Sequence, residues 1–316
     1  MNKQKFISPR LFYSIAGVFL LQMVCLLLST PMYEIDTNSF IRGGWTWDIY
    51  HNPFLNLFIA VCTKVWANIW FMVGLQSLWY AVCGSFLVGV LFRERSKFYY
   101  LALALVALEP LTMFYNFSLL AESFFTSFTL LSVAFLILWL RHGRWQTAAL
   151  FGLAMGLTFL SKLSSMSHLP LFFLVLLPTA SAQVSWIARL RAMGIALLPF
   201  LVCYAFVYLG QRSINGGDIY TVEGRVRWDF SSAMYRPEEV EAPDFKRLVD
   251  PYLFPDGKLV ANRELRRELS YLGYKDCVAE YEARNRTANA GINACDSIFG
   301  AVAQQIMARH FWAAEK

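Results

Sequence analysis

The chain has 316 residues, of which 57% are hydrophobic and 16% are charged. Soluble domains have about 45–50% apolar and about 25% charged residues, so this composition argues against a soluble globular enzyme. The charge is unevenly distributed, because residues 1–210 contain 13 basic and six acidic side chains whereas residues 211–316 contain 15 and 16. The sequence therefore predicts an apolar, basic part and a polar, nearly neutral part. A basic excess in an apolar part is a signal of membrane topology rather than of nucleic-acid binding.

The first apolar run follows directly on a basic N-terminus, as it would in a signal peptide. Lys3 and Lys5 precede the run from Leu11 to Thr30, but the sequence around Pro31 is a poor cleavage site. We therefore expect a retained membrane anchor. The six cysteines have none of the spacings of a zinc site, which excludes a zinc module as far as spacing can.

Apolar runs long enough to cross a membrane recur through the first 210 residues. A bilayer core about 30 Å thick needs about 20 apolar residues of helix. The sequence predicts seven spans, and the sixth is short and contains Pro170 and Pro178. The predicted spans are Leu11–Thr30, Gly74–Phe92, Phe98–Tyr115, Ser123–Leu140, Trp145–Ser161, Leu169–Ala182 and Met193–Gly210.

The basic residues of this part fall on alternate loops. Ten of the 13 precede the first span or lie between spans two and three, four and five, or six and seven. Because cytoplasmic loops are enriched in Lys and Arg, we expect a cytoplasmic N-terminus in the inner (cytoplasmic) membrane and a periplasmic or extracytoplasmic domain over residues 211–316. The ten residues are Lys3, Lys5, Arg10, Arg93, Arg95, Lys97, Arg141, Arg144, Arg189 and Arg191.

Two further patterns concern the packing of the membrane part. The apolar stretch from Phe54 to Phe71 would be an eighth span by hydropathy alone, but Lys64 at its centre and the alternation of basic loops favour interfacial helices in the first outer loop. Gly152 and Gly156 form a GxxxG step, which predicts a close helix contact inside the bundle.

Residues 211–316 have the composition of a small water-exposed domain, mostly helical or mixed. Cys277 and Cys295 both fall in this domain, and an oxidising compartment would allow them to form a disulfide. Residues 298–312 are amphipathic, as expected of a helix on a membrane surface or of the approach to a further span.

The acidic residues of the membrane part fall mainly on the predicted outer side. Carboxylates in a membrane domain are costly and are functional candidates by default. Only Glu94 maps to a cytoplasmic loop. We expect the other acids and three isolated cations to form an outer polar pocket, consisting of Glu34, Asp36, Asp48, Glu109, Glu122, Arg42, Lys64 and Lys162.

Transfer of a sugar from a phosphorylated lipid to a hydroxyl group would require such a pocket. A carboxylate can take the proton of the acceptor hydroxyl, and a Lys or Arg can stabilise the negative charge of the departing phosphate. The lipid tail of the donor also explains why the catalyst would be embedded in a bilayer.

Short motifs add a resemblance over residues 1 to about 170. Asp36 lies in the first outer loop, His51-Asn52-Pro53-Phe54 follows it, Glu109-Pro110 closes the third span, and the segment Gly152–Lys162 reads GLAMGLTFLSK. In order and membrane side these motifs resemble those of the GT-C polytopic glycosyltransferases, specifically bacterial relatives of protein O-mannosyltransferases and of the lipid A aminoarabinose transferase. The chain departs from that pattern, because Asn52 replaces a proline and Glu122 replaces the commoner aspartate.

The resemblance implies a GT-C-like helix bundle and a role for each matching residue. Asp36 would be the catalytic base, Glu122 a second active-site acid and Lys162 a ligand of the lipid phosphate. It also implies a polyprenyl-phosphate sugar donor and a glycan, lipid or protein acceptor, without nucleic acid. Some members of the superfamily bind a divalent metal between outer-loop acids, and Glu34, Asp36 and Glu122 could do so here, although no spacing requires it. The remaining candidates for substrate binding are Glu34, Arg42, Asp48, His51 and Lys64.

Other functions fit the same outer pocket. A flippase or export component for lipid-linked glycans, a glycan polymerase or ligase, and an outward-facing sensor remain open. A transporter should have polar residues through the depth of the membrane, whereas the acids here stop at one face. This difference favours chemistry at that face. A membrane O-acyltransferase is disfavoured, because His51 and His168 lack a recognisable acyl-transfer setting.

Overall fold

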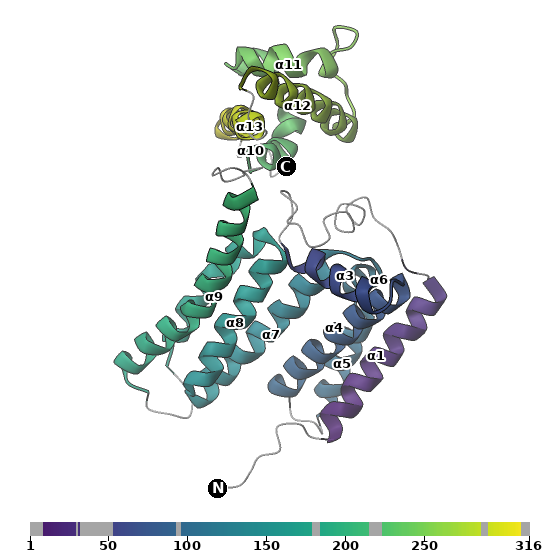
Figure 1. The fold of residues 1–316 in the computed structure, drawn as a ribbon, viewed down its shortest axis with the longest axis vertical. Helices are drawn as coiled ribbons and strands as arrows, with labels where there is room; N and C mark the ends of the chain where they lie inside the picture. Colours follow the sequence, from purple (N-terminus) through teal and green to yellow (C-terminus); the bar gives the residue numbers. More distant parts are fainter. Residues whose placement is uncertain are drawn as a thin grey trace. The chain divides into compact units, whose positions relative to one another are not determined.

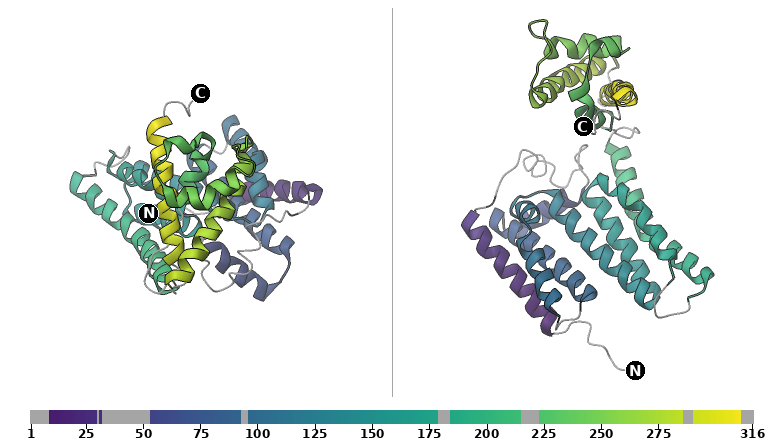
Figure 2. Two further views of the ribbon diagram at one scale, coloured as in Figure 1. Left: turned by 90° about the horizontal axis from the view of Figure 1, so that it is seen from above. Right: turned by 180° about the vertical axis from the view of Figure 1, so that it is seen from behind.

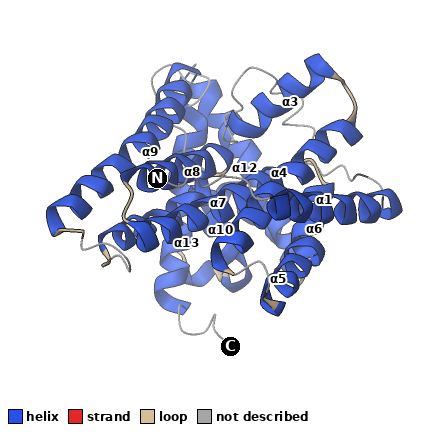
Figure 3. Cartoon of the chain, turned by 90° about the horizontal axis from the view of Figure 1, so that it is seen from below, coloured by secondary structure: helices blue, strands red, loops and turns tan. Residues whose placement is uncertain are grey.

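The computed structural model describes residues 9–29, 31, 53–92, 96–178, 184–214, 223–285 and 290–310. The chain divides into two compact units, residues 1–210 and 211–316. This boundary coincides with the one expected from the distribution of charge. Within the described ranges every regular element is a helix and none is a strand (Figure 3). The all-α class predicted from the sequence is confirmed.

The first unit is a helix bundle whose long helices lie side by side (Figures 1 and 2). The short helix α3 lies across one end of the bundle (Figure 1). The elements are α1 (Pro9–Ser29), α3 (Pro53–Val65), α4 (Ile69–Leu91), α5 (Lys97–Leu108), α6 (Pro110–Phe117), α7 (Ala121–His142), α8 (Trp145–Ser161), the 3-10 helix η1 (Leu163–Leu176) and α9 (Trp186–Ile214).

Four described helices are long and apolar enough to cross a membrane: α1, α4, α7 and the part of α9 from Trp186 to Gly210. A fifth crossing is present if α5 and α6 are counted together. α8 and η1 are shorter apolar elements, so length and composition alone do not confirm the predicted seven spans. Several helices of this unit could thus span a membrane, which is consistent with a multi-pass membrane protein.

The third predicted span, from Phe98 to Tyr115, is not one continuous helix. α5 and α6 meet at Glu109 with a bend of 47°. Pro110 has no N–H and disfavours a helical conformation of the residue before it, so α5 ends at Leu108. The Glu109 carboxylate then caps α6 by accepting hydrogen bonds from the backbone N–H groups of Leu111, at 3.1 Å, and Thr112, at 2.5 Å.

The apolar run from Phe54 to Phe71 is also divided. α3 ends at Val65, and α4 begins after Asn68, whose side-chain oxygen accepts a hydrogen bond of 2.8 Å from the backbone N–H of Trp70. The 13 residues of α3 extend about 20 Å, which is less than the thickness of a bilayer core. The run is therefore not one continuous spanning helix.

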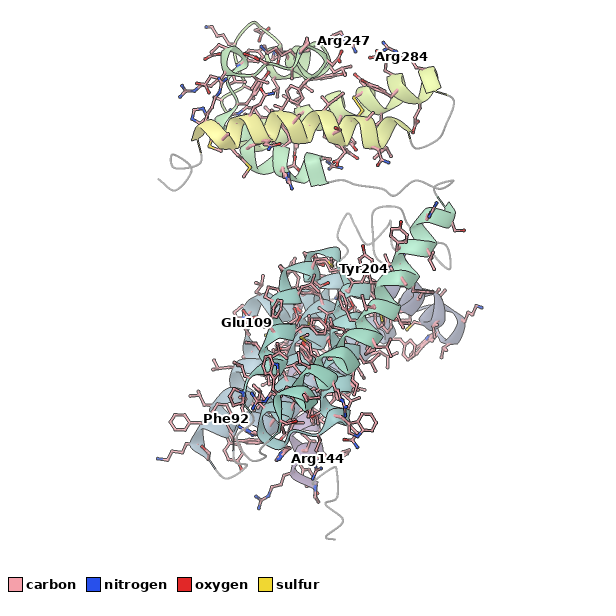
Figure 4. The ribbon with its side chains drawn as sticks, turned by 90° about the vertical axis from the view of Figure 1, so that its left-hand side faces the viewer. Phe92, Glu109, Arg144, Tyr204, Arg247 and Arg284 are labelled. Atoms are coloured by element: carbon pink, nitrogen blue, oxygen red, sulfur yellow. A yellow bond between two sulfur atoms is a disulfide. The ribbon has the colours of Figure 1, made fainter. Side chains whose placement is uncertain are left out.

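The two ends of the bundle differ in charge. We call one the basic end, where Arg141 donates a hydrogen bond to the carbonyl of Val90 and Arg189 donates one of 3.3 Å to the carbonyl of Leu176. Arg144 is labelled at this end in Figure 4. We call the other the Glu122 end, and it carries Lys162 as well. The alternation of basic loops in the sequence is therefore matched by an asymmetry of the folded bundle.

The GxxxG step brings α8 into direct contact with α9. A Cβ atom added at Gly152 would lie 1.8 Å from the carbonyl oxygen of Ala196, and one added at Gly156 would lie 2.7 Å from Sγ of Cys203. Neither approach leaves room for a methyl group. The predicted close helix contact is confirmed, and it fixes α8 against α9.

We predict that Gly152→Ala destabilises the bundle, because the added methyl group would overlap backbone atoms of α9. Overpacking of this kind costs about 1–3 kcal/mol. Gly194→Ala in α9 is the matched control, since nothing lies within 4 Å of an added Cβ there. Thermal unfolding of the two purified variants in detergent measures the difference, and equal melting temperatures would contradict the proposed contact.

The second unit is a separate helical domain with an aromatic core. It contains α10 (Glu223–Ser231), α11 (Pro243–Leu253), α12 (Arg263–Asn285) and α13 (Ala290–His310), with two single-turn 3-10 helices at Ser232–Met234 and Pro237–Glu239. Its fully buried aromatic side chains pack edge to face around one centre. They are Trp228, Tyr235, Phe245 and Phe299.

A disulfide joins the two longest helices of this unit. Cys277 of α12 and Cys295 of α13 are bonded, as expected from the sequence, with their Cα atoms 6.1 Å apart. The amphipathic stretch over residues 298–312 has a different role from the one expected. Phe299, Val302 and Ile306 of α13 are buried in the core of the unit, so this apolar face is occupied by the domain itself and not by a membrane surface.

Candidate functional site

The Glu122 end of the bundle contains an ion pair between two elements far apart in the sequence. Nζ of Lys162 lies 2.5 Å from Oε1 of Glu122. Glu122 is in the first turn of α7, and Lys162 follows the last residue of α8. The Glu122 side chain is 27% exposed and that of Lys162 is 41% exposed. The pair is therefore open enough to meet a ligand and buried enough to have a defined position.

The backbone just before Glu122 is held by a buried amide. The side chain of Gln76 in α4 donates hydrogen bonds to the carbonyl oxygens of Tyr115, Asn116 and Ser118, at 3.0, 3.3 and 2.8 Å. The last carbonyls of a helix lack partners within the helix, and Gln76 supplies one at the end of α6. This side chain consequently fixes the turn from α6 into α7.

A second buried hydrogen bond lies beside the ion pair. Oγ of Ser123 donates to Oδ1 of Asn116 over 2.5 Å, and both side chains are fully buried. In the described part of the chain, Nδ2 of Asn116 and Oγ of Ser118 have no partner. Two buried polar atoms are thus available next to the start of α7.

Aromatic side chains attach α3 to α7 on another face of α7. Phe54 of α3 lies 5.0 Å, centroid to centroid, from both Phe124 and Phe128, and Phe58 lies 4.8 Å from Phe124. Such pairs contribute about 0.5–1.5 kcal/mol each beyond their burial. These contacts hold α3 at the Glu122 end.

The 3-10 helix η1 carries two further polar groups toward α7. The ring of His168 stacks on Phe125, one helical turn after Glu122, with 5.4 Å between ring centroids. Nδ1 of His168 and Oγ of Ser165 are buried and have no partner among the described residues. A run of 14 residues in 3-10 conformation is unusual, because such runs rarely exceed three or four residues and can mark functional or strained segments.

The structure describes three of the eight residues that were expected to have catalytic or substrate-binding roles, and Glu109, also expected in the outer pocket, instead caps α6. It brings Glu122 and Lys162 together, and it places Lys64 on an exposed position in the last turn of α3. The other five expected residues lie outside the described residues. They are Glu34, Asp36, Arg42, Asp48 and His51.

The residues that position the pair were not expected from the sequence. The sequence did not single out Gln76 and Ser123, because single uncharged polar residues in apolar runs resemble ordinary helix contacts. A glutamine within a span is the signal that could have revealed Gln76, since an amide in hydrocarbon needs hydrogen-bond partners.

No group of three or more His, Cys, Asp or Glu side chains in the described ranges could hold a metal ion. Of the three acids that could bind a divalent metal by the GT-C resemblance, Glu34, Asp36 and Glu122, only Glu122 lies within those ranges.

The arrangement provides a cation beside a carboxylate at one end of an apolar bundle. A lysine ammonium group donates up to three hydrogen bonds, and Glu122 accepts one of them. The remaining donors can bind an anionic group such as a phosphate. Glu122 would then orient the ammonium group and offset part of its charge before the anion arrives.

No family model, curated protein or solved structure matches this chain. Its geometry therefore carries the functional argument.

We predict that the ion pair contributes little to stability. Glu122→Gln removes a partly exposed pair, and such pairs contribute about 0–1 kcal/mol. Ser123→Ala, one residue away, leaves the buried Asn116 amide without its donor and should cost about 1–3 kcal/mol. Thermal unfolding in detergent compares the two variants. A larger loss for Glu122→Gln than for Ser123→Ala would show that the pair is structural.

Proposed function

We propose that this protein is a GT-C-like membrane glycosyltransferase that moves a sugar from a polyprenyl-phosphate donor to a hydroxyl group of a lipid, glycan or protein. The observation that carries the proposal is the ion pair between Glu122 and Lys162 at the end of the bundle opposite the basic end, with 2.5 Å between Oε1 and Nζ. The resemblance of Asp36 and the segment up to Lys162 to GT-C motifs supports it.

In the proposed reaction the acceptor oxygen attacks the anomeric carbon of the sugar as the bond from that carbon to the phosphate oxygen breaks. Asp36 takes the proton of the acceptor hydroxyl, and the electron pair leaves with the polyprenyl phosphate. Lys162 stabilises the charge that develops on the phosphate, an effect that is strong in a low-dielectric site. Glu122 positions Lys162, and Glu34, Arg42, Asp48, His51 and Lys64 are candidates for substrate binding.

We further infer that all seven elements predicted from the sequence cross the membrane. The 17 residues of α8 extend about 26 Å at 1.5 Å per residue. The 14 residues of η1 extend about 28 Å, because a 3-10 helix rises about 2.0 Å per residue. Both lengths approach the 30 Å of a bilayer core, so the 3-10 conformation compensates for the small number of residues.

We also infer an orientation in the inner (cytoplasmic) membrane from the basic end and from the disulfide. The basic end of the bundle would face the cytoplasm by the positive-inside rule. The disulfide between Cys277 and Cys295 supports an extracytoplasmic location of residues 211–316, because structural disulfides persist in oxidising compartments.

We predict that a cysteine replacing Arg141 is protected from a membrane-impermeant thiol reagent in intact cells, whereas one replacing Arg236 is labelled. The positive-inside rule places Arg141 on the cytoplasmic side, and Arg236 is exposed in the second unit. Permeabilised cells, in which both positions should react, provide the control. Labelling of the Arg141 position in intact cells would contradict the orientation.

A transport function is the main alternative. In the described part of the bundle, Gln22, Ser77 and Ser85 are fully buried polar side chains in α1 and α4, and a flippase needs polar groups at such depths. These three are uncharged, however, and the described ion pair of Glu122 with Lys162 lies at one end of the bundle. A flippase would move a labelled lipid-linked sugar between leaflets without forming a glycosidic bond, whereas a transferase would form the bond. Polymerase and ligase functions differ only in the acceptor.

We predict that Asp36→Asn lowers sugar transfer by about 10²–10⁴-fold, the usual contribution of a general base, without loss of the folded protein. The assay uses a labelled polyprenyl-phosphate sugar and membranes with equal amounts of each variant. Glu122→Gln should also lower transfer, and Lys162→Ala should mainly weaken use of the donor.

The matched control for Glu122→Gln is Glu94→Gln, which removes a carboxylate expected on the cytoplasmic side and should leave transfer unchanged. Wild-type activity of the Asp36→Asn protein would refute the proposed base and favour the transport or sensor alternative.

A further inference from the structure

A groove runs between α1 and α5 at the basic end of the bundle, away from the Glu122 end. It has a volume of about 510 Å³ and is open to the surroundings. Both helices begin at this end, and they lie side by side (Figures 1 and 2). The groove is lined by residues from the first three turns of each helix, principally Arg10, Tyr13, Ser14, Gly17, Tyr100 and Ala104.

The groove is polar at its mouth and apolar along its length. Arg10 and Tyr13 lie in the first two turns of α1, and Oγ of Ser14 shares a hydrogen bond of 2.7 Å with the hydroxyl of Tyr99. Farther along, the walls are Val18, Leu21, Leu103, Ala104 and Ala107. An added Cβ at Gly17 would meet nothing within 4 Å. The absence of a side chain at Gly17 and the small side chain of Ala104 thus leave the floor of the groove open.

The dimensions of the groove match one leaflet of a bilayer. Its lining on α1 extends from Arg10 to Leu21, which is about 17 Å of helix. Half of a hydrocarbon core is about 15 Å. α5 ends at Leu108, where the chain bends by 47°, so the groove does not continue into the other half of the bundle. A membrane-spanning helix of a partner chain would need an apolar face along the full length of the bundle, and this groove is too short to provide one.

The charge around the mouth favours an anion. None of the residues that line the groove is acidic, Lys97 begins α5, and Lys3, Lys5, Arg93 and Arg95 are close in sequence to the two helix starts. Tyrosine hydroxyls at this level can also donate hydrogen bonds to phosphate oxygens. A charged headgroup at the mouth and an acyl chain on the floor would satisfy both parts of the groove.

We propose that the groove between α1 and α5 binds one acidic glycerophospholipid from the leaflet at the basic end, with its phosphate group near Arg10 and an acyl chain over Gly17 and Ala104. This site is independent of the proposed sugar transfer, since it lies at the other end of the bundle and shares none of its residues.

Native mass spectrometry of the purified full chain tests the proposal directly. The protein in detergent is titrated with phosphatidylglycerol or with phosphatidylcholine of the same acyl chains. We expect the wild type to retain one phosphatidylglycerol in preference to phosphatidylcholine. Arg10→Gln should weaken phosphatidylglycerol binding about fivefold, because a basic residue near an acidic surface contributes about 1 kcal/mol. Arg144→Gln is the matched control, removing an exposed arginine at the same end outside the groove.

A second pair of variants tests the acyl site. Gly17→Leu fills the floor of the groove and should reduce binding of both lipids, whereas Gly194→Leu adds the same side chain at an open position on α9 and should leave binding unchanged. Ala104→Leu replaces Gly17→Leu if the latter does not fold. The proposal is overturned if the wild type retains the two lipids equally, or if lipid binding is unchanged in Arg10→Gln or in the groove-filling variant. It is also overturned if the wild type is a dimer and the groove-filling variant is a monomer, because the groove would then bind a second copy of the chain.

Discussion

The side-chain amide of Gln76 is the contact on which the Glu122 end depends. In hydrocarbon, each backbone group without a partner costs several kcal/mol. The bend after α5 and the short α6 leave carbonyl groups exposed just before α7, and Gln76 takes up three of them. Without this amide the turn would lose its fixed geometry. The carboxylate of Glu122, four residues beyond Ser118, would then lose its fixed position relative to Lys162.

Contact between α8 and α9 has a comparable role for Lys162. Gly152 brings α8 against the backbone of α9, and the capping position at the end of α8 is occupied by Lys162 itself. Each partner of the ion pair is consequently fixed by a different interaction: a buried amide for Glu122 and a close helix contact for Lys162. The pair links α7 to α8, with α4 and α6 packed against α7 and α9 packed against α8.

Much of the fold follows from features that the sequence displays. Apolar runs of about 20 residues located α1, α4, α7 and α9, because a span of that length must satisfy its backbone internally. The glycines of α8 indicated the helix contact, and the charge asymmetry indicated the boundary near Gly210. The break at Glu109 was also encoded, in Pro110, although a continuous span was expected.

The remaining features depend on tertiary contacts that periodicity does not reveal. The pairing of Lys162 with Glu122 requires the C-terminal end of α8 to meet the N-terminal end of α7, a register set by helix packing. The 3-10 conformation of η1 has no hydropathy signature. Likewise, nothing local distinguishes Gln76, which binds three carbonyls, from Gln22, which is buried without a partner among the described residues.

The 3-10 conformation of η1 also limits how far water can enter the bundle from the Glu122 end. With three residues per turn, side chains at every third position form one straight row, which here reads Ser165, His168, Leu171 and Leu174. The polar part of this row ends at His168, six residues after Lys162, or about 12 Å at 2.0 Å per residue. Below that depth the row is leucine. The polar side chains of this row therefore extend less than halfway through a bilayer core. Along this row a charged headgroup would find no polar path to the opposite side of the membrane.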